Sequence, residues 1–471
     1  MQTKALKRDF TSGPIFWRLT TYSIPIMLTG LLQILYSMAD NIVVGRFSGD
    51  DLALAAISSS NTLTNTLINI MLGFSLGAGI LISQYYGAKN EEAVSRSVHT
   101  SMTFSAIVGL AFGALGFIFA RPILMLLKVP AELIDNALLY VRIILAGVPA
   151  QAIYNFAASI LRSVGDSKTP LIILSASGLL NVLLNLLFVI VFKMSIVGVA
   201  IATIVSQYAS VIASVVVLMR RNTCYKLSLK KLRIEKKILL RITKLGLPSA
   251  IQSAAFNLSG MVLTSSVNEL GAVTIYAFGV SNQIEAIAYN IMNSYQVAAM
   301  TFTAQNYGAL KINRIKRVTF FSIFWVATVG ILMGQLVLLF SEPLANLYIS
   351  SDNVLKNEII EAAKPMLTVM LCTYFLCGIM NVMTGITRGL GYSILSMIIC
   401  VSCVVGGRLI WVLFIYPLEP FYKNTAWLLT AFPFSWTIAG VLFAGILTVL
   451  WFKLKKMHRI SESSKKLSES V

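Results

Sequence analysis

Residues 84–90 read QYYGAKN and residues 305–311 read QNYGALK, so Gln, Tyr, Gly and Ala recur at the same spacing 221 positions later. A second pair of stretches behaves in the same way. NFAASILRSVGDS begins at Asn155 and NVMTGITRGLGYS begins at Asn381, an offset of 226 positions. Recurrence at a nearly constant offset indicates an internal repeat.

A pair of prolines supports the repeat and helps to set its extent. Pro25 and Pro248 lie 223 positions apart. We therefore predict two related halves joined by a basic linker at 223–237. The N-terminal lobe covers 1–222, and the C-terminal lobe with a basic tail covers 238–471.

The composition places the chain in a membrane. Hydrophobic residues make up 57% of the 471 residues and charged residues only 12%, with a mean hydropathy of +0.79. An ordinary soluble domain is about 45–50% apolar and about 25% charged. These values exclude a disordered chain, a nucleic-acid-binding factor and a typical soluble enzyme.

The apolar stretches are long and helical in period, which favours helices over barrel strands. We predict an all-α polytopic membrane protein with twelve transmembrane helices, six in each lobe. The predicted spans lie near 16–44, 52–83, 94–120, 133–160, 169–192, 196–220, 242–267, 273–305, 315–341, 362–386, 393–416 and 426–452.

Charge sets the expected orientation. With twelve spans, 29 Lys and Arg side chains fall on the side shared by both termini and 7 on the other side, which predicts cytoplasmic termini. This asymmetry explains most of the net charge of +19 without a nucleic-acid partner. The densest basic stretch, residues 220–244, is interpreted as a linker lying on anionic lipid headgroups, with a regulatory or partner-binding role as the alternative.

Six helices per lobe give both lobes the same orientation, so the repeats are parallel and related by a pseudo-twofold axis along the membrane normal. This arrangement is typical of carriers that work by alternating access, with the substrate between the halves. The sequence has no P-loop, no H-E-x-x-H and no G-x-S-x-G motif. We therefore expect a transporter rather than an enzyme, without a cofactor or a metal centre and without direct use of ATP.

Polar residues inside the spans are candidates for function, because ionisable groups in hydrocarbon are costly. In the first half, Asp40 is the candidate ion-coupling carboxylate, although it could instead cap the outer end of the first helix. The candidates for lining a substrate cavity beside it are Gln33, Tyr36, Asn155, Asn181 and Asn185. Helix–helix hydrogen bonding is the alternative for Asn181 and Asn185.

In the second half, Glu285 is the candidate ion-coupling carboxylate. Arg408 could pair with Glu285 and lock two helices together, or Glu285 could exchange a cation or a proton for substrate. The candidates for lining the cavity in this half are Asn257, Gln283, Tyr289, Tyr374, Asn381, Arg408 and Trp411.

These motifs together resemble the multidrug and toxic compound extrusion (MATE) transporters along nearly the whole chain. The resemblance rests on the first helix with Pro25 and its SMADNIVVG ending, on QYYGAKN, on LRSVGDSKTP, on SNQIEAIAY and on QNYGALK. It implies a V-shaped arrangement of two six-helix lobes, and export of organic, often cationic compounds against inward flow of Na⁺ or H⁺.

The resemblance also implies site residues. The helix-one aspartate, here Asp40, is typically a coupling carboxylate in this family. Helix five often reads N-x-x-x-D, whereas this chain has Asn181 and Asn185. Many relatives carry a glutamate on helix seven, whereas this chain reads SAAFNLSG there and leaves Glu285 as the acidic candidate of the second lobe. The coupling ion, Na⁺ or H⁺, stays open, and Na⁺ could bind at Asp40 or at Glu285.

We hypothesise that ion and substrate compete for a carboxylate, so that ion binding neutralises the carboxylate and releases the substrate. A flippase for lipid-linked saccharides or other lipids on a related fold is the main alternative, but it would need a more cationic cavity. A membrane-embedded enzyme, a receptor or a channel fits the repeat less well. We expect a monomer in a bacterial cytoplasmic membrane, with the lipid bilayer and a small-molecule substrate as its partners.

Overall fold

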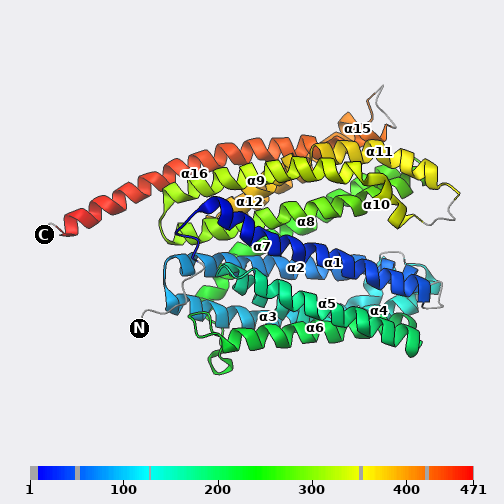
Figure 1. The fold of residues 1–471 in the computed structure, drawn as a ribbon, viewed down its shortest axis with the longest axis horizontal. Coiled ribbons are helices and arrows are strands. Elements are labelled where there is room, and N and C mark those ends of the chain that lie inside the picture. The colour runs from blue at the N-terminus through cyan, green and yellow to red at the C-terminus, as the bar shows by residue number, and fades with distance from the viewer. Residues whose placement is uncertain (1–8, 48–52, 127–128, 350–353, 419–423, 470–471) are drawn as a thin grey trace. The chain divides into compact units, whose positions relative to one another are not determined.

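The computed structural model describes residues 9–47, 53–126, 129–349, 354–418 and 424–469. Within these ranges the regular elements are helices (Figure 1). The first half contains α1 (Ile15–Phe47), α2 (Ala53–Gly87), α3 (Glu91–Leu126), α4 (Ala131–Ser163), α5 (Lys168–Leu186) with the π-helical segment η2 (Leu187–Val191), and α6 (Ser195–Arg220).

The second half follows a short 3₁₀ segment, η3 (Leu229–Lys231). It contains α7 (Lys236–Asn268), α8 (Ala272–Gly308), α9 (Ile312–Leu339), α10 (Ser341–Tyr348), α11 (Lys356–Cys372) and α12 (Tyr374–Gly389). One span is then built from α13 (Ser393–Cys400), the π-helical η4 (Val401–Gly406), α14 (Gly407–Ile410) and the π-helical η5 (Trp411–Ile415), and the chain ends with α15 (Thr425–Leu429) and α16 (Ala431–Glu469).

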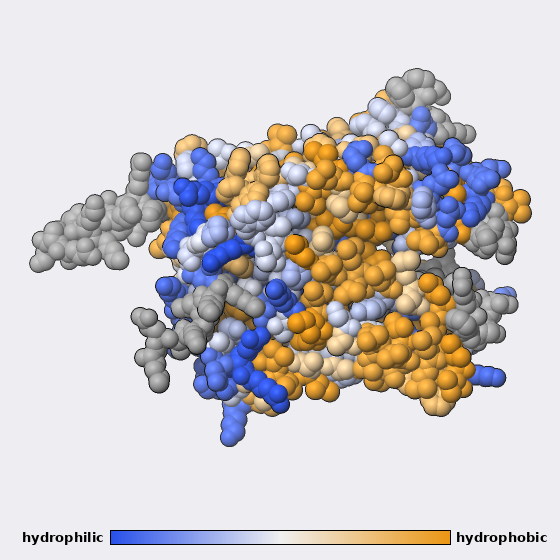
Figure 2. All heavy atoms as spheres, in the orientation of Figure 1, coloured by the Kyte–Doolittle hydropathy of each residue, from blue (hydrophilic) through white to orange (hydrophobic). Residues whose placement is uncertain are grey.

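The predicted all-α membrane fold is confirmed. Each predicted span falls on helix, and nine helices of the described ranges are long and apolar enough to cross a bilayer. A tenth span results if α11 and α12, which meet at a 42° bend, are counted together. Hydrophobic side chains cover the middle of the helices and hydrophilic ones gather at their ends (Figure 2). The helices α7 and α8 are as long as the others but carry more polar residues.

The chain divides into two compact units whose limits differ from the predicted lobes. The first unit holds Leu28–Ala250, and the second holds Phe10–Met27 with Ile251–Val471. The continuous helices α1 and α7 therefore each contribute to both units. In each case the change of unit comes two residues after a proline inside the helix, Pro25 or Pro248.

The repeat is visible in the backbone turns that end equivalent helices. After α2, the amide of Lys89 (φ 55°) donates to the carbonyl of Tyr86, and after α8 the amide of Leu310 (φ 56°) donates to the carbonyl of Tyr307. After α4 and α12, Gly165 (φ 88°) and Gly391 (φ 92°) bond back to the carbonyls of the arginines three residues earlier. Both offsets equal those of the repeated sequences.

Glycines let helices approach closely at equivalent places in the two units. A Cβ added to Gly109 on α3 would lie 2.8 Å from the Cα of Pro149 on α4. A Cβ added to Gly330 on α9 would lie 2.8 Å from the Cα of Phe375 on α12. Close packing of neighbouring helices therefore explains why a glycine stands at both positions.

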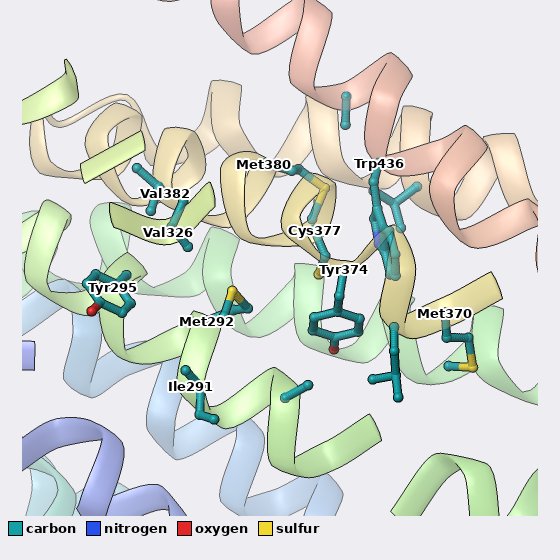
Figure 3. Packing of buried hydrophobic residues seen from close by; sticks show 14 of the residues in the cluster. Ile291, Met292, Tyr295, Val326, Met370, Tyr374, Cys377, Met380, Val382 and Trp436 are labelled. Carbon is teal, nitrogen blue, oxygen red and sulfur yellow. The ribbon is translucent and has the colours of Figure 1, made fainter. Parts of the chain in front are cut away.

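The fourth helix of each repeat is the centre of its unit. In the first unit α4 packs against α2, α3 and α6, and in the second unit α12 packs against α8, α9 and α16. Buried side chains of α12 such as Tyr374, Cys377 and Met380 meet Met292 of α8 and Trp436 of α16 (Figure 3).

Two helices extend beyond their predicted spans. Arg388 lies in the last turn of α12, past the predicted end at residue 386, and is buried. One of its terminal nitrogens donates to Oε1 of Gln252, 2.7 Å away. Asp40 does not cap the first helix, because α1 continues to Phe47.

Candidate functional site

The first unit gathers its candidate residues around Asp40. The carboxylate of Asp40 on α1 accepts a hydrogen bond of 2.5 Å from Nδ2 of Asn185 on α5. The same amide nitrogen also lies 3.3 Å from Oδ1 of Asn181, one turn earlier on α5. Asn181 in turn donates to the hydroxyl of Thr203 on α6, 3.4 Å away. A chain of polar side chains thus connects α1, α5 and α6.

Local packing holds α1 in register with α5. The ring of Tyr36, one turn before Asp40, lies directly on Gly178, where a Cβ would overlap the ring at 1.9 Å. The hydroxyl of Tyr36 donates to the carbonyl of Ser175 over 3.2 Å. Because Gly178 and Asn185 are about two turns apart on α5, this contact sets the position of Asp40 beside Asn185.

The Asp40 cluster is rich in oxygen and has no described cation within it. None of the ion pairs among the described residues involves Asp40. Oδ1 of Asn185 is buried and accepts no hydrogen bond from the part of the chain that the structure describes. Carboxylate, amide and hydroxyl oxygens are ligands for hard cations. The cluster could therefore take a small cation or a proton.

The second unit gathers its candidate residues around Glu285 on α8. The phenol of Tyr374 donates a hydrogen bond to Oε1 of Glu285. Tyr374 is the first residue of α12, at the 42° bend that separates α11 from α12, and its ring packs edge-on against Trp436. The bend between α11 and α12 therefore positions the Tyr374 hydroxyl that donates to the Glu285 carboxylate.

Arg408 lies near Glu285, but the ion pair that was one of the two alternatives for these residues is not among the ion pairs of the described residues. The two charges are within electrostatic range. However, Nε of Arg408 donates to the hydroxyl of Ser435 over 3.4 Å, and the guanidinium stacks 4.2 Å from the centre of the Phe432 ring. Arg408 lies on α14, between the π-helical segments η4 and η5.

Other polar groups extend this second cluster. Tyr289, one turn after Glu285, is 42% exposed and lies within electrostatic range of it. Nδ2 of Asn381 lies 3.4 Å from the sulfur of Cys377, which is near Glu285. The described residues include no group of three or more His, Cys, Asp or Glu side chains suited to a metal ion.

Several predicted residues do not join either cluster through a described contact. Asn155 is buried on α4, and its Nδ2 has no partner among the described residues. Trp411 is buried in the core of the second unit, where its indole nitrogen donates to the carbonyl of Trp427. The remaining three, Gln33, Asn257 and Gln283, are exposed on their helices.

Two residues of the Asp40 cluster were not predicted. Thr203 completes the hydrogen-bonded chain from α6, and Tyr140 on α4 lies within electrostatic range of Asp40. Both are polar residues in mainly apolar spans that hold other polar residues as well. That signal marks them as candidates but does not distinguish them from other serines, threonines and tyrosines of the same helices.

Two repeats of membrane helices, each with a carboxylate on a helix interior, define a multi-pass membrane protein with the architecture of a secondary transporter. The MatE family profile matches residues 25–187 and again residues 248–411. The chain therefore belongs to the MatE family, the multidrug and toxic compound extrusion family that its motifs resemble.

Relatives in bacteria align over most of the chain. The chain is 31% identical over 405 residues to the probable multidrug resistance protein YoeA of Bacillus subtilis (strain 168), which covers 84% of this chain and 86% of the relative. It is 24% identical over 390 residues to the multidrug export protein MepA of Staphylococcus aureus (strain NCTC 8325 / PS 47). This alignment covers 81% of this chain and 83% of the relative.

Solved structures share the fold. One described as the outward-facing conformation of a multidrug resistance MATE family transporter of the MOP superfamily matches with a TM-score of 0.85 and 21% identity, over 97% of this chain and all of that chain. Another, of a MATE protein in the bent conformation, matches with a TM-score of 0.86 and 20% identity over 98% of this chain.

Proposed function

We propose that the protein is an ion-coupled antiporter that exports organic compounds, mainly cationic or amphiphilic ones, in exchange for Na⁺ or H⁺. The names of the two relatives, a probable multidrug resistance protein and a multidrug export protein, support the substrate class. The observation that carries the proposal is the partly buried Asp40 carboxylate, held by Asn185 and not neutralised by a described basic side chain.

The mechanism follows from the cost of a charge in an apolar span. A carboxylate that lacks a basic partner gains most from a cation or a proton that enters its site. The oxygens of Asn181, Asn185 and Thr203 add neutral ligands around Asp40. Occupation by the ion removes the negative charge that attracts a cationic substrate, and the substrate is released.

The test uses purified protein in proteoliposomes and a fluorescent organic cation. A Na⁺ gradient and a pH gradient are imposed separately, and accumulation of the dye is recorded. We expect accumulation under one gradient, and its loss in Asp40→Asn. A normal gradient-driven rate in the double variant Asp40→Asn, Glu285→Gln would refute the proposal.

Two exposed carboxylates provide matched controls. Asp135 on α4 and Glu358 on α11 are exposed. Asp135→Asn and Glu358→Gln remove the same charges but should retain transport. A protein with a normal thermal unfolding transition that transports none of several cations under either gradient would contradict the proposal. That result would instead favour lipid flipping.

A further inference from the structure

The segment between α6 and α7, residues 221–235, is fixed along the end of the first unit and is here called the strap. The amide of Leu227 donates to the carbonyl of Leu218 in the last turn of α6 over 3.1 Å. The amide of Ser228 donates to Nε2 of His99 on α3 over 3.1 Å, and the amide of Glu235 donates to the hydroxyl of Thr100 over 3.3 Å.

Side-chain contacts complete this attachment. Tyr225 and Leu227 are buried, at 8% and 2% exposure. Arg221 forms an ion pair of 2.9 Å with Asp166, the residue that also accepts hydrogen bonds from Thr169 at the start of α5. The strap is therefore part of the folded unit rather than a free linker.

The attachment points place the strap at the edge of the hydrocarbon layer. Residues 102–120 of α3 contain no charged side chain. These 19 residues span about 28 Å of helix, which is about the thickness of the hydrocarbon core. His99 and Thr100 immediately precede this stretch and lie about 12 Å inside the end of α3 at Glu91. The middle of the strap, bonded to them, therefore lies at headgroup depth.

The outer face of the strap alternates apolar and basic side chains. Leu229, Leu232 and Ile234 are 56%, 40% and 41% exposed. Four basic side chains next to these apolar residues in the sequence are also exposed, namely Lys230, Lys231, Arg233 and Lys236. The acidic Glu235 is engaged by Arg233 at 2.7 Å and faces Arg96 at 3.7 Å. This combination is typical of segments that lie on an anionic membrane surface.

We propose that residues 229–234 form a binding surface for anionic phospholipid. The leucine and isoleucine side chains enter the boundary between headgroups and acyl chains, and Lys230 and Lys231 bind the lipid phosphates. Arg233 exchanges its exposed ion pair with Glu235, which contributes little stability, for a lipid phosphate. Anionic lipid thereby fixes the chain between α6 and α7 to the leaflet at the basic end of the helices. This inference does not depend on the transported substrate or on the coupling ion.

Only the end of the strap has a described counterpart before α1. At the offset of Pro25 and Pro248, residues 10–13 correspond to residues 233–236. Phe10 is buried and its ring centre lies 3.9 Å from that of Phe302. The carbonyls of residues 10–13 accept hydrogen bonds from Arg314 and Lys311. This segment therefore packs within its own unit, whereas Arg233 and Ile234 of the strap are exposed.

The first test measures lipid binding by native mass spectrometry of the full-length protein in detergent, with phosphatidylglycerol and phosphatidylcholine as probes. The triple variant Lys230→Gln, Lys231→Gln, Arg233→Gln should bind phosphatidylglycerol on the order of a hundredfold more weakly, at about fivefold per cation removed. Binding of phosphatidylcholine should change little. Equal binding of phosphatidylglycerol by the wild type and the triple variant would overturn the proposal.

A matched control removes three exposed cations elsewhere at the same end of the helices. Lys89, Lys168 and Arg317 are exposed and lie outside the strap. The variant Lys89→Gln, Lys168→Gln, Arg317→Gln should retain phosphatidylglycerol binding. Losses of the same size in both triple variants would show a general charge effect and would also overturn the proposal.

A second measurement reads the depth of the strap directly. A nitroxide on Leu232→Cys, in vesicles with phosphatidylglycerol, should be relaxed more by oxygen than by a water-soluble nickel complex. The native Cys224 should label slowly, because burial and the nearby Glu91 carboxylate raise its pKa to about 11. Preferential relaxation by the nickel complex would place the strap in water and favour an acidic protein partner instead.

Discussion

The two units repeat the same backbone but surround their carboxylates with different chemistry. Asp40 in the first unit is held by the amide of Asn185 and has further neutral oxygens beside it. Glu285 in the second unit is held by the phenol of Tyr374 and has the guanidinium of Arg408 within electrostatic range. Helix packing and turns are thus duplicated, whereas the polar side chains have diverged.

This difference suggests a division of labour. A cation that approaches Asp40 meets only neutral ligands among the described residues, whereas a cation that approaches Glu285 is opposed by Arg408. We therefore expect the coupling ion to bind mainly in the first unit. Glu285 is then better suited to a structural role in the second unit, through its hydrogen bond with Tyr374 and its attraction to Arg408.

The largest expected effect comes from removing the two carboxylates in turn. Asp40→Asn should weaken binding of the coupling cation by about 3 kcal/mol, or roughly a hundredfold, because the site loses its only formal charge among the described residues. Glu285→Gln should weaken it much less. Binding of Na⁺ to both variants is measured by calorimetry or with radiolabelled Na⁺. If the wild type does not bind Na⁺, proton binding is measured instead by varying the pH. Equal losses in the two variants would contradict the division of labour.

The next effect concerns the hydroxyl donors of the two clusters. Tyr374→Phe should lower the free energy of unfolding by about 1.5–3 kcal/mol, because its hydroxyl serves a buried carboxylate. Tyr36→Phe should cost only about 0.5–1.5 kcal/mol, because its hydroxyl serves a neutral carbonyl, that of Ser175. Thermal unfolding in detergent compares the pair. The reverse order would mean that Glu285 does not depend on Tyr374.

The equivalent glycine contacts should tolerate an added methyl group equally poorly in both units. Gly109→Ala and Gly330→Ala should each lower the free energy of unfolding by about 1–3 kcal/mol, because the added methyl meets backbone atoms of the neighbouring helix. Gly440→Ala on α16 is the control, since a Cβ there has no described atom within 4 Å. A large effect in one unit only would break the structural equivalence of the repeats.

The smallest effect tests the charge beside Glu285. Arg408→Gln should tighten binding of a cationic dye to the protein by about tenfold or less, because it removes a repulsive charge near the second carboxylate. Arg408→Lys retains the charge and serves as the matched control. Weaker dye binding in Arg408→Gln would show that Arg408 supports the site instead of opposing cations there.

The sequence predicts most of the fold because helix period, apolar length and internal repetition are properties of the chain itself. The offsets of the repeated motifs reappear in the turns at Gly165 and Gly391. The predicted span that ends at residue 386 leaves out Arg388, because a charged residue normally marks the end of an apolar span. Here the helix continues past it and Gln252 supplies a hydrogen-bond partner.

The site was predictable only in part, because contacts between helices depend on packing that one sequence does not reveal. Asn181 and Asn185, four residues apart in one apolar span, are predicted to line a cavity beside Asp40, and the structure joins the three by hydrogen bonds. Thr203 joins them only because α6 packs beside α5. The sequence leaves a pair between Arg408 and Glu285 open, but in the structure Arg408 contacts Ser435 and Phe432, which lie far from it in the sequence.

The exchange of helix segments between the units has a consequence for how the protein unfolds. Residues 10–27 belong to the second unit and residues 236–250 to the first, although each lies in the opposite half of the sequence. A chain cut between residues 235 and 236 would give two fragments, neither of which encodes a complete unit. We therefore expect that neither fragment folds stably alone, and that the two fragments become stable only when both are made together.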